Sequence, residues 1–205
     1  MQLPPDDGSV RRVLDIGCGP GNSTAVLRER YPHAEILGVD SSLDMIEAAC
    51  NTYPDIDFQL CDASTQLNDL PADFDVVFSN ACIQWVPDHS HLIVGLLARL
   101  KVGGVLAVQT PMNYEEPIHR IIGSIVHSPE FADKLSQQRE FYNLAPPEYW
   151  ELLHAHASAF RIWETTYMHT LPSHEAIMDW YCGTDMRPYP VSYTHLRAHE
   201  TLRHL

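Results

Sequence analysis

The sequence lacks the features of membrane, secreted and nucleic-acid-binding proteins. No apolar run is long enough to cross a bilayer. No basic-then-apolar leader opens the chain, so we expect a cytoplasmic location. Basic residues are few: 13 Lys and Arg stand against 27 Asp and Glu, and the formal net charge is −14. Such an acidic surface repels nucleic acid and anionic membranes, so we expect neither as a partner.

The cysteines and histidines lack the spacings of a disulfide framework or a metal site. The five cysteines are odd in number and contain no CxxC motif, so we predict reduced, buried thiols. The pairs His89/His91 and His154/His156 are each two residues apart. That spacing does not place both members on one helix face, and we predict no metal site.

Short apolar runs alternate with helical segments over the first half of the 205 residues. The runs are continuous rather than alternating in polarity, which is typical of a parallel sheet covered on both faces. We therefore predict an α/β fold with a mostly parallel sheet and helices on both faces. The predicted elements are strand Arg12–Ile16, helix Asn22–Tyr31, strand Glu35–Val39, helix Ser42–Asn51, strand Asp57–Leu60, strand Phe74–Ser79, helix His89–Leu100 and strand Gly104–Gln109.

The pattern changes after Pro111. The elements predicted there are helix Glu116–Val126, a loop with Pro146 and Pro147 leading into helix Glu148–His156, strand Arg161–Thr170 and helix Ser173–Tyr181. The last residues lack any apolar pattern and resemble a translated cloning scar. We predict one domain over residues 1–190 and a non-native tail over residues 191–205.

A glycine-rich turn follows the first predicted strand. It reads G-x-G-x-G from Gly17 and has Asn22 where the dinucleotide fingerprint G-x-G-x-x-G has its third glycine. No G-K-[ST] follows, which excludes a phosphate P-loop. The carboxylate of Asp15 would repel a pyrophosphate but suits the ammonium group of a methionine moiety. The turn therefore favours a cationic, phosphate-free nucleotide, and S-adenosylmethionine is the predicted cofactor.

Polar residues also end the neighbouring strands, and the carboxyl ends of parallel strands meet at one edge of a sheet. Asp40 stands about 20 residues beyond the turn, where an acidic residue takes ribose hydroxyls. Asp62 and the backbone of Ala63 can read the adenine edge, and Asn80 and Ala81 would line the methionine end. The predicted cofactor-binding residues are Asp15, Gly17, Cys18, Gly19, Asn22, Asp40, Ser41, Asp62, Ala63, Asn80 and Ala81.

Three residues of the same turn have structural side chains in this interpretation. Ser23 and Thr24 are predicted to start a helix rather than to bind a ligand. The thiol of Cys18 is predicted to pack as a small side chain, because nothing in the sequence nearby activates it as a nucleophile.

Several segments together resemble the bacterial trans-aconitate 2-methyltransferases, which are class I methyltransferases with a Rossmann-like fold. The segments are DIGCGPGNST, GVDSS, NACIQWVPDH, GGVLAVQTP, WETTYMHTLPSHEAIMDW and MRP. The glycine segment indicates only the class, whereas Pro20–Thr24 together with Gln84–His89 is far more specific. The resemblance implies methyl transfer from S-adenosylmethionine to a carboxylate of trans-aconitate, giving a monomethyl ester. Such enzymes usually have a further N-terminal helical segment and a final antiparallel strand, so we expect both ends to be missing here.

The implied reaction needs no acid or base from the protein. A carboxyl group with a pKa of about 4 is already ionised at neutral pH, so we predict no catalytic residue. A tricarboxylate does need cations, and guanidinium groups bind carboxylates bidentately. We expect a small carboxylic acid as substrate and a monomeric protein. The predicted substrate-binding residues are Trp85, Tyr114, Arg120 and Arg187, with His119, Arg161 and Tyr167 as further candidates and Trp163 as a core aromatic residue.

Three alternatives stay open. The chain could methylate another small metabolite. It could be a nicotinamide-dependent oxidoreductase, against which the missing third glycine and Asp15 count. It could also be an inactive truncated fragment that binds its cofactor weakly or not at all.

Overall fold

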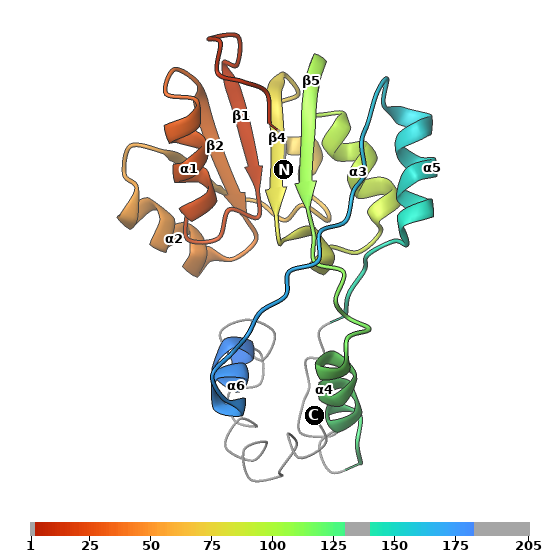
Figure 1. Ribbon diagram of the computed structural model, residues 1–205. Helices are drawn as coiled ribbons and strands as arrows, with labels where there is room; N and C mark the ends of the chain where they lie inside the picture. The colour runs from red at the N-terminus through yellow and green to blue at the C-terminus, as the bar shows by residue number, and fades with distance from the viewer. Residues whose placement is uncertain (1–2, 130–139, 183–205) are drawn as a thin grey trace. The chain divides into compact units, whose positions relative to one another are not determined.

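The computed structural model describes residues 3–129 and 140–182 (Figure 1). The chain divides into two compact units. Unit 1 comprises Met1–Pro111 and Phe141–Ile162, and unit 2 comprises Met112–Glu140 and Trp163–Leu205. No helix in the described part of the chain is both long and apolar enough to span a bilayer. Arg187 and the predicted tail of residues 191–205 lie outside the described residues.

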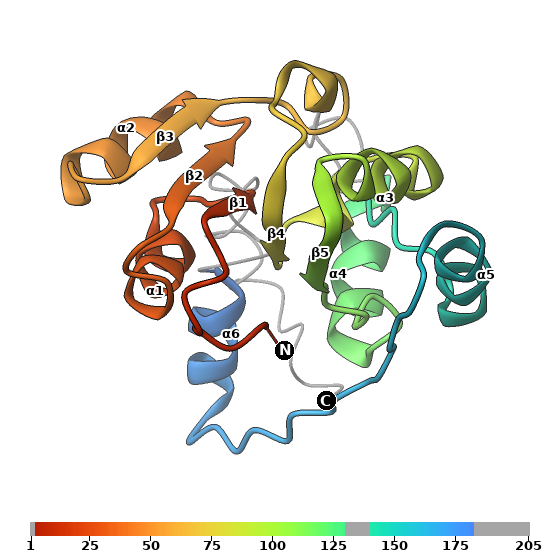
Figure 2. The same cartoon turned by 90° about the horizontal axis from the view of Figure 1, so that it is seen from above.

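Unit 1 is built on five parallel strands in the order β3-β2-β1-β4-β5 (Figure 2). This sheet confirms the predicted α/β fold. The strand order reverses between β1 and β4, and ligands of such sheets bind where this reversal occurs. The elements of the described chain are β1 (Arg12–Ile16), α1 (Asn22–Arg30), β2 (Glu35–Asp40), α2 (Leu43–Thr52), β3 (Asp57–Leu60), η1 (Leu67–Asp69), β4 (Phe74–Asn80), η2 (Ile83–Trp85), α3 (His89–Leu97), β5 (Leu100–Gln109), α4 (Pro117–Val126), α5 (Pro146–His156) and α6 (His174–Cys182).

Strand β1 separates two apolar cores, because successive side chains of a strand point to opposite faces. Leu14 and Ile16 belong to the core that contains Leu96 of α3. Val13 belongs to the other core, with Leu27 of α1. Helices α1 and α3 therefore cover opposite faces of the sheet, as the continuous apolar strands predict.

Local sequence explains where two helices begin. The side chain of Ser42 accepts a hydrogen bond from the backbone N–H of Met45 at 3.4 Å, which confirms the predicted N-cap of α2. Helix α5 begins at Pro146 rather than after the two prolines. Proline is tolerated in a first turn, because the N–H groups there have no partner within the helix. The prediction of a loop at Pro146 and Pro147 is therefore wrong.

The boundary between α3 and β5 also differs from its prediction. Helix α3 ends at Leu97, and β5 already begins at Leu100. Gly103, which reads as a helix end in the sequence, has φ 82° and lies where the register of β5 against β4 is irregular. Phe74 pairs with Leu100, whereas Val76 pairs with Val105. Glycine accepts this backbone conformation without a steric cost, so the strand continues through a bulge.

Arg161–Thr170 is predicted as a strand but has no regular secondary structure. All its residues are exposed, and it pairs with no described strand. Its β-branched and aromatic residues favour a pleated surface, but that preference depends on a neighbouring strand and on burial. Trp163 is 52% exposed, so its prediction as a core aromatic residue is also wrong.

The cysteine prediction is only partly correct. Cys18 and Cys61 are buried free thiols and Cys82 is partly buried, but Cys50 is exposed. Cys50 lies on the solvent side of α2, one position after the buried Ala49, so helix periodicity turns it outward. The side chain of Cys182 lies outside the described part of the structure.

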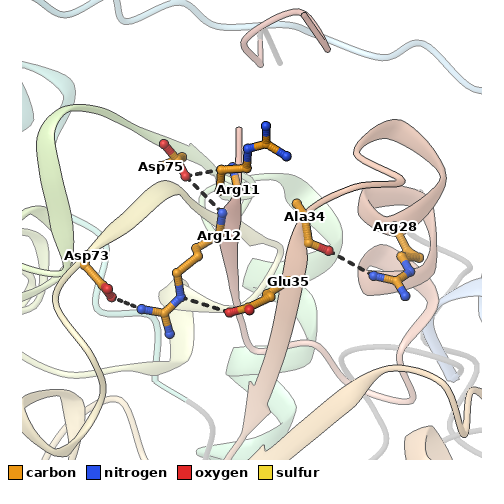
Figure 3. Close-up of polar contacts among 7 residues, drawn as sticks. All are labelled: Arg11, Arg12, Arg28, Ala34, Glu35, Asp73 and Asp75. Atoms are coloured by element: carbon orange, nitrogen blue, oxygen red, sulfur yellow. Dashed lines mark hydrogen bonds and ion pairs between the residues drawn. The ribbon is translucent and has the colours of Figure 1, made fainter. Parts of the chain in front are cut away.

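An ionic network joins the amino ends of the strands (Figure 3). Oδ2 of Asp75 accepts the backbone N–H groups of Arg11 at 2.8 Å and of Arg12 at 2.9 Å, and the same carboxylate pairs with Lys101. The guanidinium group of Arg12 pairs with Glu35 at 3.4 Å. Burial raises the pKa of Asp75, but the hydrogen bonds from Lys101 and the two N–H groups outweigh it and lower that pKa. These ion pairs and hydrogen bonds therefore hold the amino ends of the strands together.

Candidate functional site

The turn between β1 and α1 curls over the end of β2. The backbone N–H groups of Gly17 and Cys18 donate to the carbonyl of Val39 at 2.8 and 3.0 Å. Gly17 has φ 71°, and a Cβ there would lie 2.0 Å from Sγ of Cys82, so only glycine fits. Gly19 has φ 54°, and a Cβ there would meet no atom within 4 Å. The turn is closely packed at its first glycine and open at its second.

Asp15 lies at the end of β1 and is fully buried. Its Oδ2 accepts the hydroxyl groups of Ser23 and Thr24, both at 2.7 Å. Its Oδ1 has no hydrogen-bond partner among the described residues. The pKa of Asp15 is raised to about 6, because burial, with a small addition from nearby Asp40, outweighs the two hydroxyls, which lower it. A buried acceptor without a partner is rare in proteins, so Oδ1 is available to a donor from a ligand.

Asp40 ends β2 and shapes the same turn. Its Oδ2 accepts the N–H of Gly19 at 2.9 Å, and its Oδ1 accepts the N–H of Ser42 at 2.9 Å. A carboxylate has about four acceptor positions, so each oxygen can still accept one hydroxyl. The side chain is half-buried, which leaves it reachable from solvent.

Two other predicted cofactor residues already have partners in the protein. Oδ1 of Asp62 accepts the N–H and the hydroxyl of Ser64, at 2.8 and 2.7 Å. Oδ1 of Asn22 accepts the hydroxyl of Tyr53 at 3.1 Å. These side chains shape their own loops, and both are exposed, as is Ser41, while Ala63 is half-buried.

The loop after β4 completes this edge of the sheet. Asn80 ends the strand, and Ala81 has φ 52° and donates its N–H to the carbonyl of Gln109 at 2.9 Å. Ile16 of β1 pairs with Val39 on one side and with Ser79 on the other. The predicted residues at the ends of β1, β2 and β4 are therefore brought to one edge of unit 1.

This edge and the opposite one differ in charge. The turns that carry Asp15, Asp40 and Asp62 contain no Lys or Arg in the described segments 15–24, 40–44, 61–66 and 79–88. The cations of unit 1 lie near the amino ends of the strands, apart from Arg161, which follows α5; they are Arg11, Arg12, Arg28, Arg30, Arg99 and Lys101. A cationic ligand is electrostatically favoured at the carboxyl ends.

Residues 13–104 match the family model of the methyltransferase domain. The trans-aconitate 2-methyltransferase of Azoarcus sp. strain BH72 is 41% identical over 189 residues, which cover 92% of this chain and 72% of that protein. The enzyme of the same name from Klebsiella pneumoniae strain 342 is 41% identical over 88% of this chain and 69% of its own. The chain belongs to the trans-aconitate 2-methyltransferase family. The resemblance read from the sequence is therefore confirmed.

Two solved structures share the fold of this family member at low identity. The phosphoethanolamine N-methyltransferase 2 of Haemonchus contortus, solved with S-adenosyl-L-methionine, has a TM-score of 0.54 at 22% identity and covers 76% of this chain and 34% of its own. The YcgJ protein of Bacillus subtilis has a TM-score of 0.54 at 20% identity and covers 72% of this chain and 62% of its own. These likenesses establish the fold alone.

Sequence reasoning missed the role of Thr24 and Cys82 in this member of the family. Thr24 does start α1, but its hydroxyl also holds Asp15, and the residue is fully buried. A hydroxyl three positions before the apolar Leu27 lies on the buried side of the helix, and that spacing could have revealed it. Cys82 follows a strand end and rests on Gly17, and no local pattern predicts this contact.

The thiols beside the turn are not nucleophiles. The pKa of Cys82 is raised to about 12, first by burial and then by Asp40 and Asp15. The pKa of Cys18 is also raised, first by burial and then by the same two carboxylates. Since the thiolate is the reactive form, both side chains pack as neutral groups, as predicted for Cys18.

The described residues of this chain that are predicted to bind the substrate belong to different units. Trp85 lies on η2 in unit 1, with its ring centroid 4.8 Å from that of Phe141. Tyr114 and Arg120 belong to unit 2, where Arg120 pairs with Glu115 at 2.9 Å. Arg187 lies outside the described residues. The substrate prediction therefore stays a prediction.

Proposed function

We propose that this protein transfers a methyl group from S-adenosylmethionine to a carboxylate of trans-aconitate and so forms a monomethyl ester. The observation that carries the proposal is the buried carboxylate of Asp15, whose Oδ1 has no partner among the described residues. It stands beside a glycine turn that offers no phosphate site. The identity of 41% to a trans-aconitate 2-methyltransferase over 92% of this chain supports the acceptor.

The side chains of unit 1 fit this cofactor. Oδ1 of Asp15 can accept the ammonium group, and such charge-assisted hydrogen bonds are among the strong ones. Asp40 can accept ribose hydroxyls, and the space beside Gly19 leaves room for the ligand. When bound, S-adenosylmethionine supplies an electrophilic methyl group on a positively charged sulfur.

The protein needs to orient the reactants rather than move a proton. An acceptor carboxylate is ionised at neutral pH, so no side chain has to act as a base. Orientation alone can contribute about 7 to 11 kcal/mol in favourable cases. The acidic edge of unit 1 suits a cation but repels an anionic acceptor. We therefore assign the acceptor carboxylates to cationic side chains; of the two arginines predicted to bind them, Arg120 and Arg187, only Arg120 is described.

Calorimetric titration with S-adenosylhomocysteine, with NAD as the control ligand, tests the cofactor. We expect selective binding of S-adenosylhomocysteine. Binding of NAD instead would indicate the oxidoreductase alternative, and binding of neither by a folded chain would contradict the cofactor site. Transfer of a radiolabelled methyl group to trans-aconitate and to other small carboxylic acids then tests the acceptor. Transfer only to another acid would leave a methyltransferase but overturn trans-aconitate as its substrate.

A further inference from the structure

Gln84 joins three segments at the carboxyl ends of β4 and β5. It lies within η2 and is 3% exposed. Its Nε2 donates to the carbonyl of Ala81 at 2.9 Å, and its Oε1 accepts the hydroxyl of Thr110 at 3.3 Å. Its backbone carbonyl accepts the N–H of Tyr142 at 3.0 Å. A buried amide with this set of partners is specific to one arrangement of the three segments.

The hydrogen bonds of this group run in one direction. Nδ2 of Asn143 donates to Oγ1 of Thr110 at 3.3 Å and to the carbonyl of Pro111 at 2.8 Å. The hydroxyl of Thr110 has a single proton, which it donates to Gln84. The amide of Gln84 is thereby oriented with its donor toward Ala81.

Ala81 ends this chain of hydrogen bonds and has a strained backbone. Its φ of 52° lies in the left-handed region, which is unfavourable for alanine. Such a conformation persists only when the surrounding structure enforces it. Here the N–H of Ala81 is held by Gln109 and its carbonyl by Gln84, so both backbone groups are fixed.

Cys82, the residue that follows Ala81, contacts the glycine turn. Cys82 packs against Gly17 so closely that a Cβ on the glycine would lie 2.0 Å from Sγ. The backbone of Ala81 therefore sets where Cys82 rests on the turn beside Asp15. The imidazole of His89 also donates to the carbonyl of Ile83 at 2.8 Å. Ile83 follows Ala81 and Cys82 in the chain, so this hydrogen bond is not made to the backbone of Ala81.

We propose that Gln84 is a positioning residue for methyl transfer, because through Ala81 it holds the loop that lines the methionine end of the cofactor site. This inference rests on the proposed function. Without the Nε2 donor, Ala81 can leave the left-handed region and the loop can shift against the glycine turn. The charged groups assigned to the cofactor, Asp15 and Asp40, lie in other loops, so we expect the loss to fall mainly on the orientation of the reacting groups, and hence on kcat.

Gln84→Glu gives a test with its own pH signature. A protonated glutamic acid can donate to Ala81 and accept from Thr110 as glutamine does, whereas an ionised one can only accept. We expect kcat about 10- to 100-fold below that of the wild type near pH 8, with little change in the KM for S-adenosylmethionine. The ratio of the two kcat values should recover as the pH is lowered. Gln59→Glu, on an exposed glutamine of β3, is the matched control and should show neither effect.

Gln84→Met separates positioning from stability. It fills a similar volume without a donor, so we expect the same loss in kcat with no recovery at low pH, in a variant that circular dichroism shows to be folded at the assay temperature. Normal kcat in folded Gln84→Met, or no pH-dependent recovery in folded Gln84→Glu, would overturn the inference. A wild-type protein that binds no S-adenosylhomocysteine and methylates no acid would instead overturn the proposed function, and this inference with it.

Discussion

The hydroxyl group of Thr24 donates a 2.7 Å hydrogen bond to Oδ2 of Asp15. The first turn of α1 is thereby joined to the carboxylate of Asp15 near the end of β1. The hydroxyl group of Ser23 donates to the same oxygen. Both bonds favour the ionised carboxylate against the burial that raises its pKa. The geometry leaves Oδ1 as the oxygen without a hydrogen-bond partner among the described residues.

Replacing Thr24 by valine should weaken cofactor binding, although Thr24 itself is not predicted to contact the ligand. The substitution removes one donor from Oδ2, so the pKa of Asp15 rises further and less of the carboxylate is ionised at neutral pH. We expect the affinity for S-adenosylhomocysteine near pH 7 to fall about 3- to 10-fold, the equivalent of one hydrogen bond. Thr52→Val is the matched control, because the Thr52 hydroxyl donates to Ala48 at the exposed end of α2. Equal affinities by calorimetry in both variants would contradict this role of Thr24.

Cofactor affinity should itself depend on pH. The pKa of Asp15 is raised to about 6, so the carboxylate that accepts an ammonium group is lost as the pH falls through that value. Titrations between about pH 5 and pH 8 should show affinity rising with pH. Asp15→Asn should bind weakly at every pH and show no such rise. A wild-type affinity that is constant over this range would remove Asp15 from the binding site.

The same carboxylate should lower the stability of the fold at high pH. The folded pKa of about 6 is above the unfolded value of 3.8, so the stabilising contribution is fully present below 3.8 and is lost as the pH rises through 6. The difference corresponds to about 3 kcal/mol. Asp15→Asn should therefore gain in free energy of unfolding relative to the wild type between about pH 4 and pH 8, as measured with urea. A constant difference would show that burial does not perturb Asp15.

Much of the fold could be predicted because its signals are local. The apolar run at Arg12–Ile16 and the cap at Ser42 depend on neighbouring residues, and both predictions are confirmed. The start of β5 could not be predicted, because Gly103 reads as a helix end unless the bulge against β4 is known. Arg161–Thr170 has the composition of a strand, but a strand also needs a partner, which composition does not specify.

The site could be predicted only in part. Parallel strands place Asp15 and Asp40 at one edge, so their proximity follows from the sequence once the strands are known. The hydrogen bonds of Thr24 and Gln84 depend on helix phase and on segments far apart in the chain. The spacing of Thr24 and Leu27 indicates a buried hydroxyl, but its partner and the bonds of Gln84 could be found only in three dimensions.

The ionic network at the amino ends of the strands should matter for stability alone. Asp75→Asn keeps the size of the side chain but places an amide among the N–H groups of Arg11 and Arg12 and the ammonium of Lys101. We expect the free energy of unfolding to fall by about 1 to 3 kcal/mol. The lowered pKa of Asp75 means that its contribution is present above the unfolded pKa and disappears in acid, so the variant and the wild type should converge there. Reduced affinity for S-adenosylhomocysteine in a folded variant would contradict this separation of roles.

Arg120 offers a test of how the acceptor is bound. Its guanidinium group pairs with Glu115 in an exposed position, and surface pairs of this kind contribute little to stability. We expect Arg120→Gln to raise the KM for trans-aconitate about 10-fold or more while the affinity for S-adenosylhomocysteine stays unchanged. Arg11→Gln, an exposed arginine at the amino end of β1, should change neither. An unchanged KM would exclude Arg120 from the acceptor site.

The two ends of the strands in unit 1 differ in how their carboxylates are balanced. The described turns that carry Asp15, Asp40 and Asp62 contain no Lys or Arg, whereas the arginines of Figure 3 lie at the other end, beside Glu35, Asp73 and Asp75. Before any contact forms, the resulting field draws a diffusing sulfonium compound toward one end of the strands and turns a polyanion away from it. The rate at which the cofactor associates should therefore fall as ionic strength rises, whereas the rate at which it dissociates should change much less.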